Sequence, residues 1–526
     1  MIGRIGSSSL PDNLVPGRNV AFLFAAIVAG LVIVALPLPA AIALLTIPVV
    51  LLLVVAYPVF GLGLALFLGP LGALEAIVLG PALLDSGQLA LLLTIAAWVG
   101  AGLARRRLVV PTTAINIPWL LFVAIAAVSL IDAYSVSLGM VELLKWLEIG
   151  LIVWLIVDFA GEESWRPSGF PAMVRLVLGM LLLSGMVQAA IGIWQFGLRG
   201  TGPEHFIVLE RFYRAYGTFE QPNPFGGYMN LTAFPALGLL LGMVMARLGM
   251  NRRRTQPEIF TPVRLWFLLA VCAAVVGTLA VILSWSRGAW LGFLAGAVVL
   301  ALFSTRHIKR GLVIAGLAAF LVAGGLWVGV STGAGPAQAI IGRLAGFLDE
   351  FTLGDVRGVD INDANYSVLE RLAHWQAAAD MARDDLWTGV GFGNYGVAYA
   401  DYDLINFPDP LGHAHNYYLN LLAEIGVPGL AAYILFWLVI IGQSIRLARR
   451  LAWPERGVVV GLLAAWVALA VHHLVDKLYV NNIYIHLGVM IGLLQLFAWR
   501  GFQPAGEQSI GEIAPEPGHL IQECLG

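Results

Sequence analysis

Three short stretches of an otherwise apolar sequence contain residues that could act on a substrate. The most compact is GHAHNYYLNLLAEIGVPGL, residues 412–430, in which His415 precedes Asn416. The ordinary pKa of a histidine lies near neutrality, so His415 could take a proton from an attacking hydroxyl group. If this stretch is helical, Asn416, Asn420 and Glu424 form a polar stripe on one face. An apolar segment follows, so we expect the stripe to lie at a membrane surface.

The second stretch is LSWSRGAWLGFLAG, in which Ser286, Arg287 and Gly288 form a turn between two apolar segments. So short a turn places the arginine at or just inside a membrane surface, where an ionisable group is costly unless it faces a cavity or a partner. A guanidinium group is always charged and can hold a phosphate through two parallel hydrogen bonds. The alternative is an arginine that extends to the interface and anchors the turn.

The third stretch, RFYRAYGTFEQPNPFGGY, spans residues 211–228. It combines Arg211 and Arg214 with aromatic residues and an Asn-Pro turn at Asn223. Two guanidinium groups beside aromatic rings could form a recessed site for an anion and a sugar. The alternative is an interfacial belt, in which arginines and aromatic side chains lie among the lipid headgroups.

A metal site is a further hypothesis for the histidines. His413 and His415 form a His-x-His pair, but the sequence around them offers no clear set of carboxylate or cysteine ligands. His472, His473 and Asp476 raise the same question near the end of a later apolar segment, and we interpret them as structural or secondary. We therefore predict no metal ligand set and no cofactor.

The composition places these stretches in a membrane protein. Hydrophobic residues make up 59% of the 526 residues and charged residues only 12%. Apolar runs of membrane-spanning length recur along almost the whole chain. We predict an all-α, polytopic integral membrane protein with about 12–14 transmembrane helices and a partly helical outer (periplasmic) loop. The net charge of −2 gives no reason to expect a nucleic-acid partner.

The predicted spans follow one another closely along the chain. They are residues 19–36, 38–57, 59–78, 88–104, 116–133, 141–160, 172–196, 226–246, 264–284, 288–304, 311–330, 421–445, 457–474 and 481–499. The segment 59–78 has Gly and Pro at its middle, which favours a re-entrant or broken helix. Short loops rich in Lys and Arg belong in the cytoplasm, and these lie near Arg105, Arg252, Lys309 and Arg449.

This orientation predicts seven regions. They are a cytoplasmic tail (1–18), amino-terminal transmembrane helices (19–196), an outer loop with the arginine and aromatic motif (197–225), transmembrane helices with the SRG turn (226–330), a large outer loop (331–420), carboxy-terminal transmembrane helices (421–499) and a cytoplasmic tail (500–526). In the large loop, RLAHWQAAADMARDD predicts an amphipathic helix from about Val368 to Arg383, which the glycine cluster GVGFGNY ends. We expect a folded cap.

Taken together, these motifs resemble the O-antigen ligase and O-antigen polymerase superfamily of multispanning bacterial glycosyltransferases. The resemblance covers about residues 205–445, and the amino-terminal third matches only as generic spans. It is carried by residues in all three stretches and by the GVGFGNY cluster: Arg214, Gly217, Asn223, Ser286, Arg287, Gly288, His415, Asn416, Gly426 and Gly429.

The resemblance implies a glycan donor carried on undecaprenyl diphosphate, used at the outer face of the bacterial cytoplasmic (inner) membrane. Arg214 and Arg287 would stabilise the leaving diphosphate in place of a metal ion, and His415 would take the proton of the acceptor hydroxyl in an inverting displacement. Substrate contacts would come from Arg211, Asn223, Ser286, Arg371 and Asn416. The other partners are membrane lipids and a lipid, polysaccharide or protein acceptor, as in lipopolysaccharide and other surface-polysaccharide biosynthesis.

Other functions stay open on the sequence alone. A polymerase of the same superfamily would use the same residues and differ in its product length and acceptor. A multispanning solute transporter predicts ionisable residues near the middle of the bilayer, and Glu142, Lys145 and Glu148 are the residues that fit it. Their spacing also permits simple salt-bridge pairing along a helix. A non-catalytic scaffold in an envelope complex would tolerate replacement of Arg287 and His415.

Overall fold

The computed structural model describes residues 37–80, 84–106, 110–161, 169–249, 259–305, 307–348, 356–361 and 365–501. Its amino-terminal half contains α2 (Leu38–Ala56), α3 (Pro58–Leu68), η1 (Gly69–Leu71), α4 (Gly72–Leu79), α5 (Ser86–Ala104), α6 (Asn116–Val128), α7 (Val136–Gly161), α8 (Gly169–Gly197), η3 (Glu204–Phe206), α9 (Pro222–Arg247) and α10 (Val263–Leu283). Two short antiparallel strands, β1 (Ile207–Val208) and β2 (Phe212–Tyr213), precede α9.

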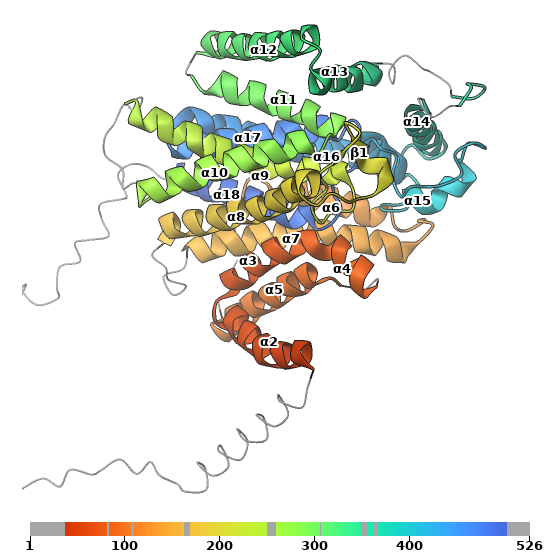
Figure 1. Ribbon diagram of the computed structural model, residues 1–526. Coiled ribbons are helices and arrows are strands. Elements are labelled where there is room, and N and C mark those ends of the chain that lie inside the picture. Colours follow the sequence, from red (N-terminus) through yellow and green to blue (C-terminus); the bar gives the residue numbers. More distant parts are fainter. Residues whose placement is uncertain are drawn as a thin grey trace, which may run out of the picture.

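The carboxy-terminal half continues the helical pattern (Figure 1). It contains α11 (Arg287–Phe303), α12 (Ile308–Ser331), α13 (Gly335–Leu348), α14 (Tyr366–Asp384), α15 (Tyr395–Ala398), η5 (Tyr399–Asp401), α16 (Tyr417–Arg450), α17 (Glu455–His472) and α18 (Ile483–Gly501). The predicted first span at 19–36, the tail 1–18 and the chain beyond residue 501 lie outside the described residues, as do parts of three basic loops.

The helices have the lengths and composition of membrane spans. Eight of them, within the described residues, are long and apolar enough to cross a membrane, and four shorter helices are also apolar. The prediction of an all-α polytopic membrane protein is therefore confirmed. The predicted interruption in the segment 59–78 is present as well, because η1 separates α3 from α4.

Small residues allow three central helices to pack closely. A Cβ atom on Gly238 of α9 would stand 2.6 Å from the Cα atom of Gly461 of α17, so the two backbones are in direct contact. Two turns further along α17, a Cβ atom on Gly292 of α11 would stand 2.7 Å from the carbonyl oxygen of Ala468. Small residues at helix interfaces in membranes permit this approach. It brings the amino-terminal ends of α9 and α11 beside the carboxy-terminal end of α17.

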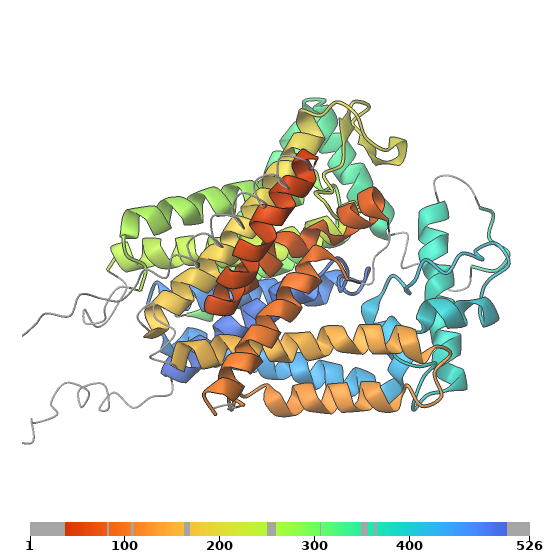
Figure 2. The ribbon, with the colours of Figure 1, turned by 90° about the horizontal axis from the view of Figure 1, so that it is seen from below.

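A cap, formed by residues 365–416, lies at the same end of the helix bundle (Figures 1 and 2). Its main helix is α14, which confirms the predicted helix from Val368 to Arg383 to within two residues at each end. Buried side chains of α14 pack against α15 and the first turns of α16, with Met381, Tyr395 and Ala423 among them. The cap is thus a folded unit with a hydrophobic core.

The break at Gly426 joins the cap to α16. Gly426 has φ 62° inside the helix, so the helical hydrogen bonds around it are interrupted. The freed carbonyl oxygens of Ala423 and Glu424 accept from the backbone N–H groups of Val390 and Gly391, at 2.9 and 3.0 Å. The glycine spacing after the His-Asn pair therefore has a backbone cause, because residues of the GVGFGNY cluster replace the missing helical partners.

Replacing Gly426 with alanine should destabilise this joint. A Cβ atom there would stand 2.5 Å from the carbonyl oxygen of Leu386, and left-handed backbone at a non-glycine residue costs about 1–3 kcal/mol. We expect Gly426→Ala to lower the thermal unfolding midpoint of the purified protein in lipid nanodiscs. Gly442→Ala is the matched control, because it lies in the same helix with no atom near its added Cβ. Equal midpoints for the two variants would contradict this account.

Candidate functional site

The three sequence stretches meet at the end of the bundle where the cap lies. The Nε atom of Arg214 donates to the carbonyl oxygen of Ser284 at 3.0 Å, and the backbone N–H of Ala215 donates to Leu283 at 2.9 Å. These contacts tie the 211–228 stretch to the turn before α11. On the other side of that turn, a Cβ atom on Gly288 would lie 2.7 Å from Nε2 of His472. The SRG turn thus packs directly on the end of α17.

Arg214 is a partly buried cation in a positively charged surrounding. Its guanidinium group donates to Oδ1 of Asn223 at 3.1 Å, which confirms that these two predicted residues are neighbours. Burial, together with the charges of Arg343, Arg371 and Arg287, lowers the pKa of Arg214 to about 9. The group remains protonated at neutral pH. We call Arg214 and the three arginines whose charges act on it the arginine cluster: Arg214, Arg287, Arg343 and Arg371.

Each member of the arginine cluster comes from a different part of the fold. Arg214 precedes α9, Arg287 begins α11, Arg343 lies in α13 and Arg371 in α14. The Nε atom of Arg343 donates to the carbonyl oxygen of Trp285 at 2.9 Å, which fixes α13 next to the SRG turn. The sequence reading missed Arg343, because a single arginine in a long polar segment carries no local signal. Four cations near one another, two of them held by hydrogen bonds, favour the binding of a polyanion.

Two other predicted contact residues have visible structural roles. The side chain of Ser286 caps α11 by accepting from the backbone N–H of Ala289 at 3.4 Å. The side-chain oxygen of Asn416 caps α16 by accepting from Tyr418 and Leu419, at 3.0 and 3.2 Å. Both helices therefore begin at a side-chain cap, which satisfies backbone donors that a helix start leaves open.

Arg211 stands apart from the other predicted site residues. Its side chain is exposed and lies over the ring of Phe212, with 4.6 Å between the guanidinium carbon and the ring centroid. No contact given for the described residues connects it to the arginine cluster. This position corresponds to the interfacial alternative considered for the stretch, so a direct substrate contact by Arg211 remains a prediction.

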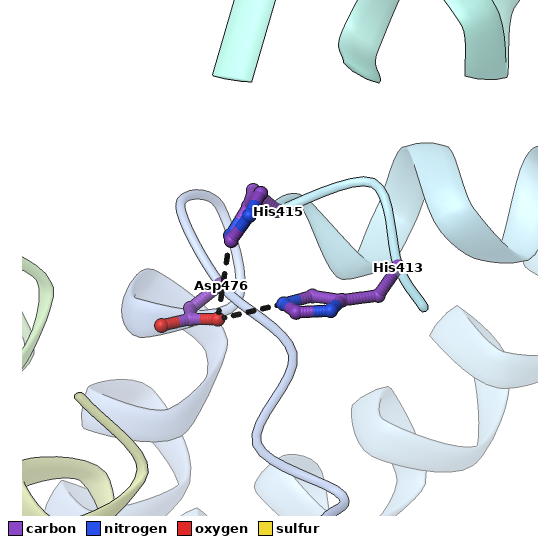
Figure 3. Close-up of side chains that lie close together, drawn as sticks. All are labelled: His413, His415 and Asp476. Carbon is purple, nitrogen blue, oxygen red and sulfur yellow. Dashed lines mark hydrogen bonds and ion pairs between the residues drawn. The ribbon is translucent and has the colours of Figure 1, made fainter. Parts of the chain in front are cut away.

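His415 lies at the carboxy-terminal end of the cap, beside the loop that joins α17 to α18 (Figure 3). Its backbone has φ 51°, an uncommon value for a residue with a side chain. Neither ring nitrogen has a hydrogen-bond partner among the described residues. Its Nδ1 atom is 3.9 Å from Oδ1 of Asp476, longer than a hydrogen bond. Burial, followed by the charge of His413, lowers the pKa of His415 to about 3, so the ring is neutral at physiological pH.

Asp476 belongs to the site, although the sequence reading set it aside as structural or secondary. Its Oδ1 atom lies 3.2 Å from Nε2 of His413 (Figure 3). Burial by itself raises the pKa of Asp476, but the contact with His413 and the neighbouring histidine charges lower it well below its usual range. A buried, ionised carboxylate therefore faces His413 and His415. The signal was hidden because 60 residues of sequence separate the partners.

The polar stripe of α16 lies on the face of the helix that packs against the cap. Asn420 and Glu424 are both buried, at 0% and 2% exposed. Oδ1 of Asn420 accepts from the backbone N–H of Ala414 at 3.1 Å, and Oε1 of Glu424 accepts from Tyr395 at 3.2 Å. The stripe therefore fixes the segment that carries His415. Its polar side chains bind the protein's own backbone.

A buried ion network fixes the loop that carries Asp476. Lys477, the next residue, lies 3.4 Å from Oε1 of Glu142 in α7, and Lys145 lies 2.7 Å from Oε2 of the same carboxylate. Glu424 of α16 also acts on Lys477 through its charge. The residues singled out in α7 as fitting a transporter are thus paired at least in part, and Glu142 supports the α17–α18 loop.

Comparison with known proteins gives one family. Residues 272–434 match the family model described as O-antigen ligase. The match includes the SRG turn, the cap and the His-Asn stretch, and it ends before Asp476. Over these residues the match agrees with the resemblance seen in the sequence, and it supports a ligase-like membrane enzyme of surface-glycan biosynthesis. No curated protein matches the chain significantly.

Removing Lys477 should destabilise the loop beside His415. Lys477→Met leaves the buried Glu142 carboxylate without one of its cations, and breaking a buried ion pair costs about 3–5 kcal/mol. We expect a lower unfolding midpoint in nanodiscs, partly restored in the Lys477→Met/Glu142→Gln double variant. Arg383→Met is the control, because its pair with Asp380 is exposed and such pairs contribute about 1 kcal/mol or less. A Lys477→Met midpoint equal to that of the control would show that the pair is not needed.

Proposed function

We propose that this O-antigen ligase-like protein transfers a preassembled glycan from undecaprenyl diphosphate to an acceptor hydroxyl group at the outer face of the cytoplasmic membrane. The observation that carries the proposal is the position of the arginine cluster and of His415, whose ring nitrogens are buried without a hydrogen-bond partner among the described residues, at one end of an apolar bundle. A lipid-linked diphosphate needs an apolar surface for its lipid chain, which lies in the bilayer, and cations for its charges, which lie at the membrane surface. The family match supports the same class of reaction.

The arginine cluster would bind the diphosphate before and during the reaction. Cleavage of the bond between the sugar and the phosphate leaves negative charge on the departing diphosphate. Guanidinium groups that are already fixed in place stabilise such charge without reorganisation at the moment of reaction. Arg214 is held by Ser284 and Asn223, and Arg343 by Trp285, so both are preorganised. In this proposal no metal ion is required for the leaving group.

His415 would act as the general base. The Nε2 atom would take the proton of the acceptor hydroxyl group while the oxygen attacks the anomeric carbon from the side opposite the diphosphate. This direct displacement inverts the configuration at that carbon. The positive ring that forms would be stabilised by the charge of Asp476, whose Oδ1 atom lies 3.9 Å from Nδ1. Asp476 is thus a positioning and charge-stabilising partner of the base.

The decisive experiment measures glycan transfer by the full-length protein in lipid nanodiscs, with a native undecaprenyl-diphosphate glycan and an extract of candidate acceptors. Loss of a general base or of an oxyanion-stabilising donor typically costs about 10²–10⁴-fold in rate. We therefore expect His415→Ala and Arg287→Ala to lose at least about 100-fold, while wild type stays active in EDTA. His205→Ala and Arg383→Ala are controls, because both side chains are exposed.

The assay separates the outcomes. Folding of each variant is checked by its unfolding midpoint. If well-folded His415→Ala and Arg287→Ala transfer glycan as fast as wild type, the proposed site is wrong. If EDTA abolishes transfer and a divalent ion restores it, the metal-independent mechanism is wrong. The length of the product distinguishes a ligase, which moves a finished glycan once, from a polymerase, which extends it.

The role of Arg343 can be tested by donor binding. A hydrogen bond to a charged group contributes about 1.5–3 kcal/mol, so Arg343→Gln should weaken binding of a polyprenyl diphosphate about 10- to 100-fold. Binding is measured with a fluorescent donor analogue at fixed salt. Arg343→Lys keeps the charge but changes the hydrogen-bond geometry, so its affinity for the donor should lie between those of wild type and Arg343→Gln. Arg383→Gln, in the cap, is the control, and an equal effect there would point to general surface charge instead.

A further inference from the structure

We propose that His413, His415 and Asp476 form a binding site for a divalent transition-metal ion of the Zn²⁺ type, and that the bound ion inhibits the enzyme. The binding of the ion stands on geometry alone. Its inhibitory effect rests on the proposed role of His415 as the base.

The three side chains present ligand atoms at one point. One nitrogen from each imidazole and one carboxylate oxygen all lie within 4.8 Å of one another. A zinc ion with ligand bonds of about 2.0–2.2 Å holds tetrahedral ligand atoms about 3.3–3.6 Å apart. The distance from Nε2 of His413 to Oδ1 of Asp476 is already 3.2 Å, and the distance from Nδ1 of His415 is 3.9 Å. Small side-chain rotations would complete the site.

The contacts of His413 point to a cation between it and Asp476. The Nδ1 atom of His413 lies 3.0 Å from the carbonyl oxygen of Leu411, and a carbonyl can only accept, so Nδ1 carries the hydrogen. In the neutral ring, Nε2 then directs a lone pair at the carboxylate oxygen of Asp476. Two lone pairs at 3.2 Å repel each other unless a proton or a metal ion lies between them.

The same pattern is typical of metal-binding histidines. A histidine that binds a metal through one nitrogen usually donates its other N–H to a carbonyl or carboxylate, which fixes the tautomer. His413 has this arrangement through Leu411. The second histidine, His415, has two buried ring nitrogens without a hydrogen-bond partner among the described residues. Such nitrogens gain a partner when a metal binds, which offsets the cost of their burial.

The three metal-ligand atoms favour one class of ion. Two imidazole nitrogens and one carboxylate oxygen are ligands that zinc uses in sites with three protein ligands and one open position. Mg²⁺ and Ca²⁺ prefer oxygen ligands, so they should bind this site poorly. The sequence reading named the His-x-His pair but lacked a third ligand. Asp476 supplies it from the α17–α18 loop.

Metal binding would remove the base. Coordination uses the lone pair of Nδ1 of His415 and leaves the ring proton on Nε2. That nitrogen then has no lone pair to accept the proton of an acceptor hydroxyl group. The ion would also neutralise the charge of Asp476. An enzyme that needs no metal would therefore work in EDTA and lose activity when Zn²⁺ is added.

Metal binding is tested on the full-length protein in nanodiscs, without any glycan substrate. Zn²⁺ binding is measured by isothermal titration calorimetry, and Co²⁺ is used as a coloured substitute. X-ray absorption of the zinc-loaded wild type reports its ligands and needs no variant. We expect one ion per chain and two imidazole ligands. Because loss of a residue that merely supports a ligand costs about 10–100-fold in affinity, His413→Gln and Asp476→Asn should weaken binding at least that much.

The controls make the result decisive. His205→Ala removes an exposed histidine and should leave the Zn²⁺ affinity unchanged. The proposal is overturned if wild type binds no ion in a 1:1 ratio, if the absorption spectrum shows no imidazole pair, or if both ligand variants bind as wild type does. Any of these results would make a proton the cation between His413 and Asp476.

An activity measurement then tests the inhibition. Micromolar Zn²⁺ should stop glycan transfer by wild type, and EDTA should restore it. Transfer that continues with a fully zinc-loaded site would overturn the inhibitory role. If wild type transfers no glycan under any condition, the proposed function fails, whereas the calorimetry and absorption results still decide whether the metal site exists.

Discussion

The close approach of α9, α11 and α17 is the constraint on which the site depends. Gly238 meets Gly461 backbone to backbone, and Gly292 meets Ala468, two turns further along α17. In a bilayer, hydrophobic burial does not drive helices together, so this packing relies on small residues and dispersion contacts. Because these helices alternate in direction, the packing brings two helix starts and one helix end to one level. Arg287, Asn223 and His472 are residues at those ends.

The arginines at this end of the bundle lie close enough for their charges to act on Arg214. Burial lowers the pKa of Arg214 most, and the charges of Arg343, Arg371 and Arg287 lower it further. Carbonyl oxygens of Ser284 and Trp285 accept from Arg214 and Arg343, which holds both guanidinium groups in place. A bound diphosphate would bring further negative charge to this cluster. Guanidinium groups that are held before the donor arrives need little reorganisation when it binds, and this is how a preorganised anion site works.

The structural features that depend on local sequence pattern could be predicted from the sequence. Apolar runs gave the spans, the interruption in 59–78 and helix α14, because these follow from periodicity and from Gly and Pro. The His-Asn, SRG and RAYG stretches were recognisable as motifs, and the structure brings them together. Arg343 and Asp476 could not be found in this way. Their proximity to His415 or the arginine cluster depends on tertiary packing, and each is a single polar residue in its own segment.

Asp476 and Lys477 show why the residues of α7 belong to the site. The two neighbours have opposite charges and contact different partners. Asp476 faces His413 and His415, and Lys477 faces Glu142. Contacts of both residues therefore hold the α17–α18 loop. Moving the loop away from Glu142 would separate a buried ion pair, and separated buried charges are costly. Glu142 in α7 therefore has a structural role that does not involve solute movement. This weighs against the transporter hypothesis and favours a rigid candidate site.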